Sequence, residues 1–151
     1  MKTNRIAVVV TALLLAVAPN LHAACSNASL RGTFGYSSQG FVPVTADISP
    51  ALFLPQAQTG LITFDGKGVV TSGTYTINTT DPAGGVSRGT FTGTYAVNSD
   101  CTGTFESNPD IGGSLHYDLL VLSPTELVAI ASDVGGSQIF SAKKIRAAEG
   151  R

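Results

Sequence analysis

The chain has 151 residues, a formal net charge of −1 and a charged fraction of only 13%. Its one basic cluster (Lys143, Lys144 and Arg146) lies near the C-terminus, where we interpret it as a solvated strand end and tail. No basic patch interrupts the predicted strands, which argues against a nucleic-acid partner.

Residues 1–24 have the three-part layout of a secretory signal peptide. Lys2 and Arg5 supply a positive start, and residues 6–18 form an uncharged apolar run. Leu21-His22-Ala23 then offers small or aliphatic side chains at the two positions that a signal peptidase reads. The run is shorter than the about 20 residues that a membrane-spanning helix needs. We therefore predict a secreted or periplasmic protein whose mature form does not cross a membrane, with an uncleaved N-terminal anchor as the alternative.

Cys25 and Cys101 are the two cysteines of the chain, and two interpretations of Cys25 stay open. Cys25 follows the cleavage region directly, so it could carry a lipid anchor, although His22 fits poorly in the sequence that precedes a lipidated cysteine. Two cysteines in an exported chain more simply form one disulfide. A Cys25–Cys101 bond would tie the N-terminal segment to the domain and contribute about 4 kcal/mol of stability.

Beyond residue 24 the sequence predicts strands, because short Thr-, Val- and aromatic-rich runs alternate with Gly, Asn, Asp and Pro. Short links such as Asp65-Gly66-Lys67-Gly68 make successive strands antiparallel neighbours. We predict one all-β domain over 25–146, an eight-stranded antiparallel up-and-down barrel closed by pairing of the first and last strands, with a β-sandwich as the alternative. Residues 147–151 are predicted to be a flexible tail. The predicted strands are 29–42, 58–65, 68–79, 86–98, 101–107, 114–122, 126–132 and 137–146.

One connection, residues 43–57, is long and contains three prolines. Ser49-Pro50 could open a single helical turn that carries Leu52, Phe53 and Leu54. We predict that this apolar segment is either a plug under one mouth of the barrel or a lid over it, and we favour the plug.

A recurring Gly-Thr-aromatic unit predicts which side chains face inward. Residues i and i+2 of a strand share a face, so the glycine and the ring point one way and the threonine points the other. On the inner face the glycine leaves room for a neighbouring ring. The candidate ring residues are Phe34, Tyr36, Tyr75, Phe91, Tyr95, Phe105, Tyr117 and Phe140, and the same alternation adds Ile62, Phe64, Ile77, Val97, Leu115 and Leu119. These rings form either a packed core, which we favour, or the wall of a ligand cavity.

The sequence carries no recognisable catalytic signature, and we assign no catalytic residue, metal ligand or cofactor. His116 is the one histidine beyond residue 24. Strand alternation places it with Asp118 on the face opposite Tyr117, so we expect His116 to point to solvent.

Three segments, residues 25–36, 60–68 and 93–104, resemble a group of small uncharacterised secreted bacterial proteins. Asn98-Ser-Asp-Cys-Thr-Gly is the most specific of these motifs, and the resemblance runs from Cys25 to about residue 144. By layout the chain is also similar to calycin and allene-oxide-cyclase-type barrels. This similarity implies a barrel fold and transfers no activity and no catalytic residue.

The function that these features favour is that of an exported, non-enzymatic barrel. It would bind a small apolar or aromatic ligand or serve a structural role at the cell surface. One alternative is an isomerase or cyclase of the lipid type that uses an apolar barrel cavity. The other is an adhesion or assembly module that uses the Thr-rich outer face.

Overall fold

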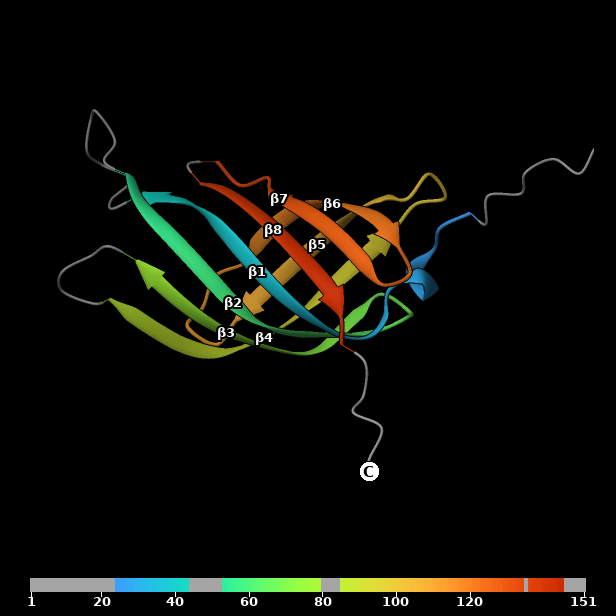
Figure 1. Ribbon diagram of the computed structural model, residues 1–151, viewed down its shortest axis with the longest axis horizontal. Coiled ribbons are helices and arrows are strands. Elements are labelled where there is room, and N and C mark those ends of the chain that lie inside the picture. The colour runs from blue at the N-terminus through green and yellow to red at the C-terminus, as the bar shows by residue number, and fades with distance from the viewer. Residues whose placement is uncertain (1–23, 44–52, 80–84, 135, 146–151) are drawn as a thin grey trace, which may run out of the picture.

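The computed structural model describes residues 24–43, 53–79, 85–134 and 136–145, and it shows a closed barrel of eight antiparallel strands (Figure 1). Each strand pairs with its neighbours in chain order, and β8 pairs with β1 to close the barrel. The elements are η1 (Asn27–Ser29), β1 (Arg31–Pro43), β2 (Phe53–Asp65), β3 (Val69–Thr79), β4 (Val86–Val97), β5 (Thr102–Pro109), β6 (Leu115–Ser123), β7 (Glu126–Ala131) and β8 (Ser137–Lys144). The predicted up-and-down barrel is confirmed, and the β-sandwich alternative is wrong.

The prediction for residues 43–57 is wrong where it can be checked. β2 begins at Phe53, so Phe53 and Leu54 belong to a strand and not to a helical turn. The β1–β2 ladder continues to the pair Pro43–Phe53, and Pro55 lies beyond Gln56, the last residue of β2 that pairs with β3. A proline is tolerated there because that edge of the strand has no partner among the described residues. The rest of the predicted plug or lid, 44–52, lies outside the described residues, as do 1–23 and the predicted tail 147–151.

One end of the barrel is closed by η1, which lies on the right of Figure 1. The side chain of Asn27 accepts a hydrogen bond from the Val97 amide at 2.8 Å and donates one to the Lys67 carbonyl at 3.2 Å. The Tyr95 hydroxyl donates to the Leu30 carbonyl at 3.1 Å, and Leu30 is fully buried. These contacts hold the N-terminal segment across the mouth of the barrel.

The predicted disulfide is confirmed and lies at this closed end. Cys25 and Cys101 are bonded, with their Cα atoms 4.9 Å apart and a sequence separation of 76. Cys101 sits in the β4–β5 turn with φ 71°, a left-handed conformation that favours glycine. The disulfide thus fixes Cys101 in a backbone conformation that non-glycine residues rarely adopt.

The half of the barrel next to η1 is a packed core. Phe64 makes edge-to-face contacts with Phe34 and Tyr95, with ring centroids 5.4 and 5.0 Å apart. The largest fully buried side chains are Phe34, Leu30, Ile62, Leu127 and Val70. An eight-stranded barrel has an interior that side chains can just fill, and at this end they do so.

The inner-face glycines make room for rings, as the Gly-Thr-aromatic unit predicts. A Cβ on Gly73 would lie 2.2–2.4 Å from ring atoms of Phe91, and one on Gly60 would lie 3.0 Å from the ring of Tyr36. The ring of Phe91 therefore lies directly across the bare backbone of β3. This is the small-and-large alternation by which narrow barrels are filled.

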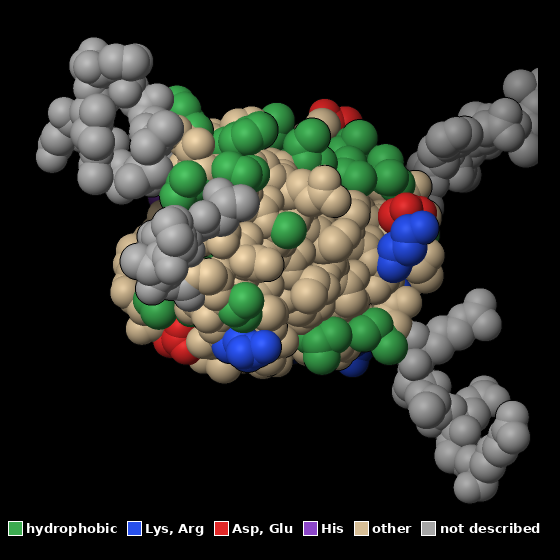
Figure 2. Space-filling view, turned by 60° about the vertical axis from the view of Figure 1, so that its left-hand side comes forward, with side chains coloured by type: hydrophobic (Ala, Val, Ile, Leu, Met, Phe, Trp, Pro, Cys, Tyr) green, Lys and Arg blue, Asp and Glu red, His purple; other side chains and the backbone are tan. Residues whose placement is uncertain are grey.

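The outer surface is poor in charge and rich in small polar residues. Figure 2, with the open end turned forward, shows few charged side chains and several groups of exposed hydrophobic side chains between them. Thr33 and Thr63 form a cross-strand hydroxyl pair at 3.1 Å, and Lys143 pairs with Glu126 at 3.3 Å while both stay exposed. No helix within the described ranges is long and apolar enough to cross a membrane.

We predict that Cys25→Ser lowers the free energy of unfolding by about 4 kcal/mol, because it releases a long loop in the unfolded chain. Cys101→Ser should do the same and leave a thiol on Cys25 that a thiol reagent titrates. Cys101→Gly should be about 1 kcal/mol more stable than Cys101→Ser, because glycine adopts the positive φ without strain. Urea unfolding without reductant measures the stability of all three variants. An unchanged stability of Cys25→Ser would contradict a stabilising role of the disulfide.

We predict that Gly73→Ala destabilises the fold by about 2 kcal/mol, because the new Cβ would overlap the Phe91 ring. Gly136→Ala is the control, since a Cβ there meets nothing within 4 Å and should change stability by less than about 0.5 kcal/mol. In the Phe91→Leu background, Gly73→Ala should cost less stability than in the parent protein. The effect of Gly136→Ala should be the same in both backgrounds. Equal stability of the two alanine variants, measured by urea unfolding, would show that the ring does not need the bare backbone.

Candidate functional site

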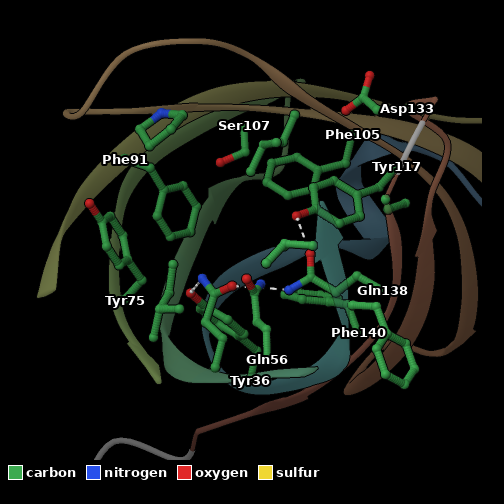
Figure 3. Close-up of a pocket in the computed structure, with 18 of the residues that line it drawn as sticks. Tyr36, Gln56, Tyr75, Phe91, Phe105, Ser107, Tyr117, Asp133, Gln138 and Phe140 are labelled. Carbon is green, nitrogen blue, oxygen red and sulfur yellow. Dashed lines mark hydrogen bonds between the residues drawn. The ribbon is translucent and has the colours of Figure 1, made fainter. Parts of the chain in front are cut away.

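The end of the barrel opposite η1 holds a cavity of about 320 Å³ (Figure 3). Its size lies at the lower limit of small-molecule pockets in proteins, about 300 Å³. The wall consists mainly of rings from β1, β3, β4, β5, β6 and β8, and the mouth is bordered by the β5–β6 and β7–β8 connections. The exposed apolar side chains of Phe41, Ile111 and Val134 extend the wall outward at the mouth.

The structure divides the eight ring candidates into two groups. Phe34 and Tyr95 lie in the packed half beneath η1, away from the cavity. The six rings that line the cavity are Tyr36, Tyr75, Phe91, Phe105, Tyr117 and Phe140. The two interpretations of the inner face, packed core and cavity wall, thus each describe one end of the same barrel.

Leu115 differs from the other inner-face positions because it is 45% exposed. It is the first residue of β6 and lines the mouth of the cavity. Its orientation follows the predicted alternation, but no layer of side chains lies above it to bury it.

The cavity rings contact one another and form a continuous wall. Phe105 stacks on Tyr117 with centroids 5.4 Å apart, and Tyr36 lies 4.8 Å from Phe140. Phe91 completes the wall with a centroid 6.4 Å from that of Phe105. Flat apolar surfaces of this kind bind planar or aromatic groups through area burial and ring-to-ring contact.

A chain of hydrogen bonds crosses the floor of the cavity and begins at Tyr117. The Tyr117 hydroxyl donates to the Gln138 side-chain oxygen at 3.1 Å, a bond drawn in Figure 3. The Gln138 Nε2 atom donates twice, to Ser38 Oγ at 2.7 Å and to Gln58 Oε1 at 3.1 Å. Tyr117, Gln138 and Ser38 are buried, so these bonds replace the water that the polar groups lose on folding.

The chain continues through Gln58 to the far wall. Gln58 Nε2 donates to the Tyr36 hydroxyl at 2.8 Å, and Tyr36 donates in turn to the Thr74 carbonyl at 3.2 Å. Every donor in the series points the same way, from β6 through β8, β2 and β1 to β3. The cavity therefore has an apolar wall and a neutral polar floor.

Burial keeps the tyrosines of this floor protonated. It raises the pKa of Tyr117 to about 12, with a smaller contribution from the charge of Asp133. Burial also raises the pKa of Tyr36, against an opposing effect of its hydrogen bond from Gln58. Both hydroxyls are hydrogen-bond donors at neutral pH and not bases or nucleophiles.

The sequence analysis missed the polar floor. Ser38, Gln58, Ser107 and Gln138 occupy inner-face positions two or four residues from a predicted ring or aliphatic residue. Continuing the period-two alternation outward from Tyr36, Ile62, Phe105 and Phe140 reaches all four. The inner-face list stopped at apolar residues, and this restriction hid the part of the interior that is polar.

Two aspartates fix the loops at the mouth. Asp110 accepts hydrogen bonds from the Tyr75 hydroxyl at 2.9 Å and from the Thr90 amide at 2.8 Å. These bonds lower the pKa of Asp110, and the bond from the Thr90 amide has the largest effect. The second aspartate, Asp133, lines the mouth, and both of its carboxylate oxygens contact the exposed His116.

His116 lies on the outer face, as alternation predicts, with its side chain 53% exposed. It contacts Asp133 and not Asp118. The His116 Nδ1 atom lies 2.8 Å from Asp133 Oδ1, and the His116 amide donates to Oδ2 at 2.7 Å. This double contact ties the β7–β8 connection to β6. No group of three His, Cys, Asp or Glu residues in the described part of the chain could hold a metal ion.

Comparison with known proteins assigns no relative to this barrel. No protein family matches the chain, and no curated protein and no solved structure is detectably similar to it.

We predict that the pKa of His116 lies above its ordinary value of 6.5, because the ring hydrogen bonds to the Asp133 carboxylate. The pKa of Asp133 is lowered from 3.8, first by the amide of His116. The histidine contribution to stability is complete below pH 6.5 and is lost as the pH rises through the raised pKa. The aspartate contribution is complete above pH 3.8 and is lost as the pH falls through the lowered pKa.

A proton NMR titration of the His116 ring measures this prediction. Asp133→Asn should return the histidine pKa toward 6.5, whereas Asp118→Asn should leave it nearly unchanged. A His116 pKa at or below 6.5 in the parent protein would contradict the pairing.

Proposed function

We propose that this protein is an exported, non-enzymatic barrel that binds a small apolar or aromatic ligand in the open-end cavity. The observation that carries the proposal is the asymmetry of the interior. One half is packed and sealed by η1, while the other half leaves about 320 Å³ open to the outside between rings. A core that served stability alone would be filled at both ends, because empty apolar space costs stability.

The chemistry of the lining supports binding over catalysis. Within the described residues, the cavity interior presents rings, amides and hydroxyls, and the one carboxylate of the lining, Asp133 at the mouth, is bound to His116. The tyrosine hydroxyls that face inward are held in their protonated form by burial. General acid–base chemistry needs a group whose pKa lies near the working pH, and neither Tyr36 nor Tyr117 is such a group.

Export rests on the N-terminal sequence and is supported by the disulfide. Residues 1–24 resemble a secretory signal, and a Cys25–Cys101 bond forms and persists in oxidising compartments. Bonding of Cys25 in this staple uses the thiol that a lipid anchor would need. We therefore favour a free secreted or periplasmic barrel over a tethered one.

Ser107→Phe tests the proposal by filling the cavity. Ser107 is buried on the inner face of β5 and lines the cavity, so a ring at this position would occupy the ligand space. The probe is 1-aminoanthracene, whose fluorescence rises when it enters an apolar site. We expect Ser107→Phe to weaken probe binding by at least about tenfold.

Thr104→Phe is the matched control, since Thr104 is exposed on the outer face of the same strand. It should leave the affinity for the probe unchanged, and circular dichroism should show that both variants fold. Equal loss of binding in both variants, or no saturable binding to the parent protein, would overturn the proposal.

A further inference from the structure

We infer that the cavity selects uncharged aromatic ligands that carry a hydrogen-bonding group, such as aromatic amides and phenols, and rejects aromatic carboxylates. The inference rests on the proposed function and adds the chemical class of the ligand. It follows from two properties of the lining, its charge and its unused hydrogen-bonding capacity.

The lining offers no positive charge to an anion. Among the described residues that line the cavity there is no Lys, Arg or His. Asp133, at the mouth, is the one ionisable lining residue among them other than tyrosine. A second carboxylate, Asp110, lies at the same end and accepts the Tyr75 hydroxyl. An anionic ligand buried among these rings would lose its hydration without gaining an opposite charge, which costs several kcal/mol.

The floor has spare hydrogen-bonding capacity of both kinds. Gln58 uses one of its two N–H groups on Tyr36, which leaves one donor without a partner among the described residues. Gln138 uses both of its N–H groups, but its oxygen accepts one bond, from Tyr117, and retains a second lone pair. A ligand oxygen can therefore accept from Gln58 while a ligand N–H or O–H donates to Gln138.

Gln56 adds a further amide to the lining of the cavity. Its side chain makes no hydrogen bond to another described residue. The floor thus offers one hydrogen-bond donor and one acceptor. A ligand group that both accepts and donates a hydrogen bond can use both. Neutral amides and hydroxyls meet this requirement, and hydrocarbons leave it unused.

The first experiment compares 2-naphthamide with 2-naphthoate, which have the same shape and differ in charge, by isothermal titration at neutral pH. We expect the amide to bind at least about 100-fold more tightly than the carboxylate. Binding of both probes with equal affinity would overturn the inference and leave the proposed function intact. Failure of both to bind, together with failure of 2-isopropylnaphthalene, would overturn both.

The second experiment separates hydrogen bonding from area burial. Gln58→Met removes the free donor and keeps an apolar stem, so it should weaken the binding of 2-naphthamide about tenfold. It should change the affinity for 2-isopropylnaphthalene by no more than about twofold, because that probe makes no hydrogen bond. A parallel loss for both probes would show that Gln58 supports the fold of the cavity and does not contact the ligand group.

The third experiment reverses the charge selectivity. Gln56→Lys places an ammonium group in the cavity and should raise the affinity for 2-naphthoate about tenfold. Gln39→Lys is the matched control, because Gln39 is exposed on the outer face of β1 and adds the same charge outside the barrel. An equal gain in both variants would assign the effect to net charge and overturn the role of the lining.

Discussion

The limited room inside an eight-stranded barrel is the constraint on which the rest of this structure depends. Such a barrel holds about one filling of side chains or one small ligand. Every inward residue must therefore share its layer with a small one, as Phe91 does with Gly73 and Tyr36 with Gly60. The rings can be large because the facing strands have bare backbone, and the same glycines let the strands approach closely enough to coil and close.

That constraint explains why the two ends differ. At the closed end Leu30 fills the space between the strands, and Tyr95 and Asn27 bind the backbone groups of η1 and its neighbours. The disulfide holds this segment in place from the β4–β5 turn. At the open end the residues of β1, β2 and β8 that continue inward are Ser38, Gln58 and Gln138, which are long or polar but do not fill the barrel. The cavity is thus a consequence of which residues follow the rings along each strand.

The strands and their order could be predicted from the sequence because alternation and turn residues are local signals. Phe53 was placed wrongly because Pro55 suggests a loop, whereas this edge of β2 has no partner among the described residues and tolerates a proline. The pairing of His116 with Asp133 could not be predicted, since it depends on how the β7–β8 connection folds back on β6. The floor could have been predicted in part. Alternation places Gln58 and Gln138 inside, but that their amides meet depends on the β8–β1–β2 order and its register.

The buried amides are the feature hardest to explain by stability alone. A glutamine side chain inside a barrel must recover the hydrogen bonds that it loses to water, and a half-satisfied polar network is less stable than an apolar filling of the same shape. Here Gln58 and Gln138 hydrogen bond to each other, to Tyr36 and to Tyr117. Both side chains line the cavity, and each retains hydrogen-bonding capacity that no other described residue uses. Aliphatic residues at these two positions would fill the space and remove the unsatisfied capacity. The amides at these two positions are consistent with the proposed contact between the floor and a ligand, and the lining contains no Lys, Arg or His among the described residues, which disfavours an anionic ligand.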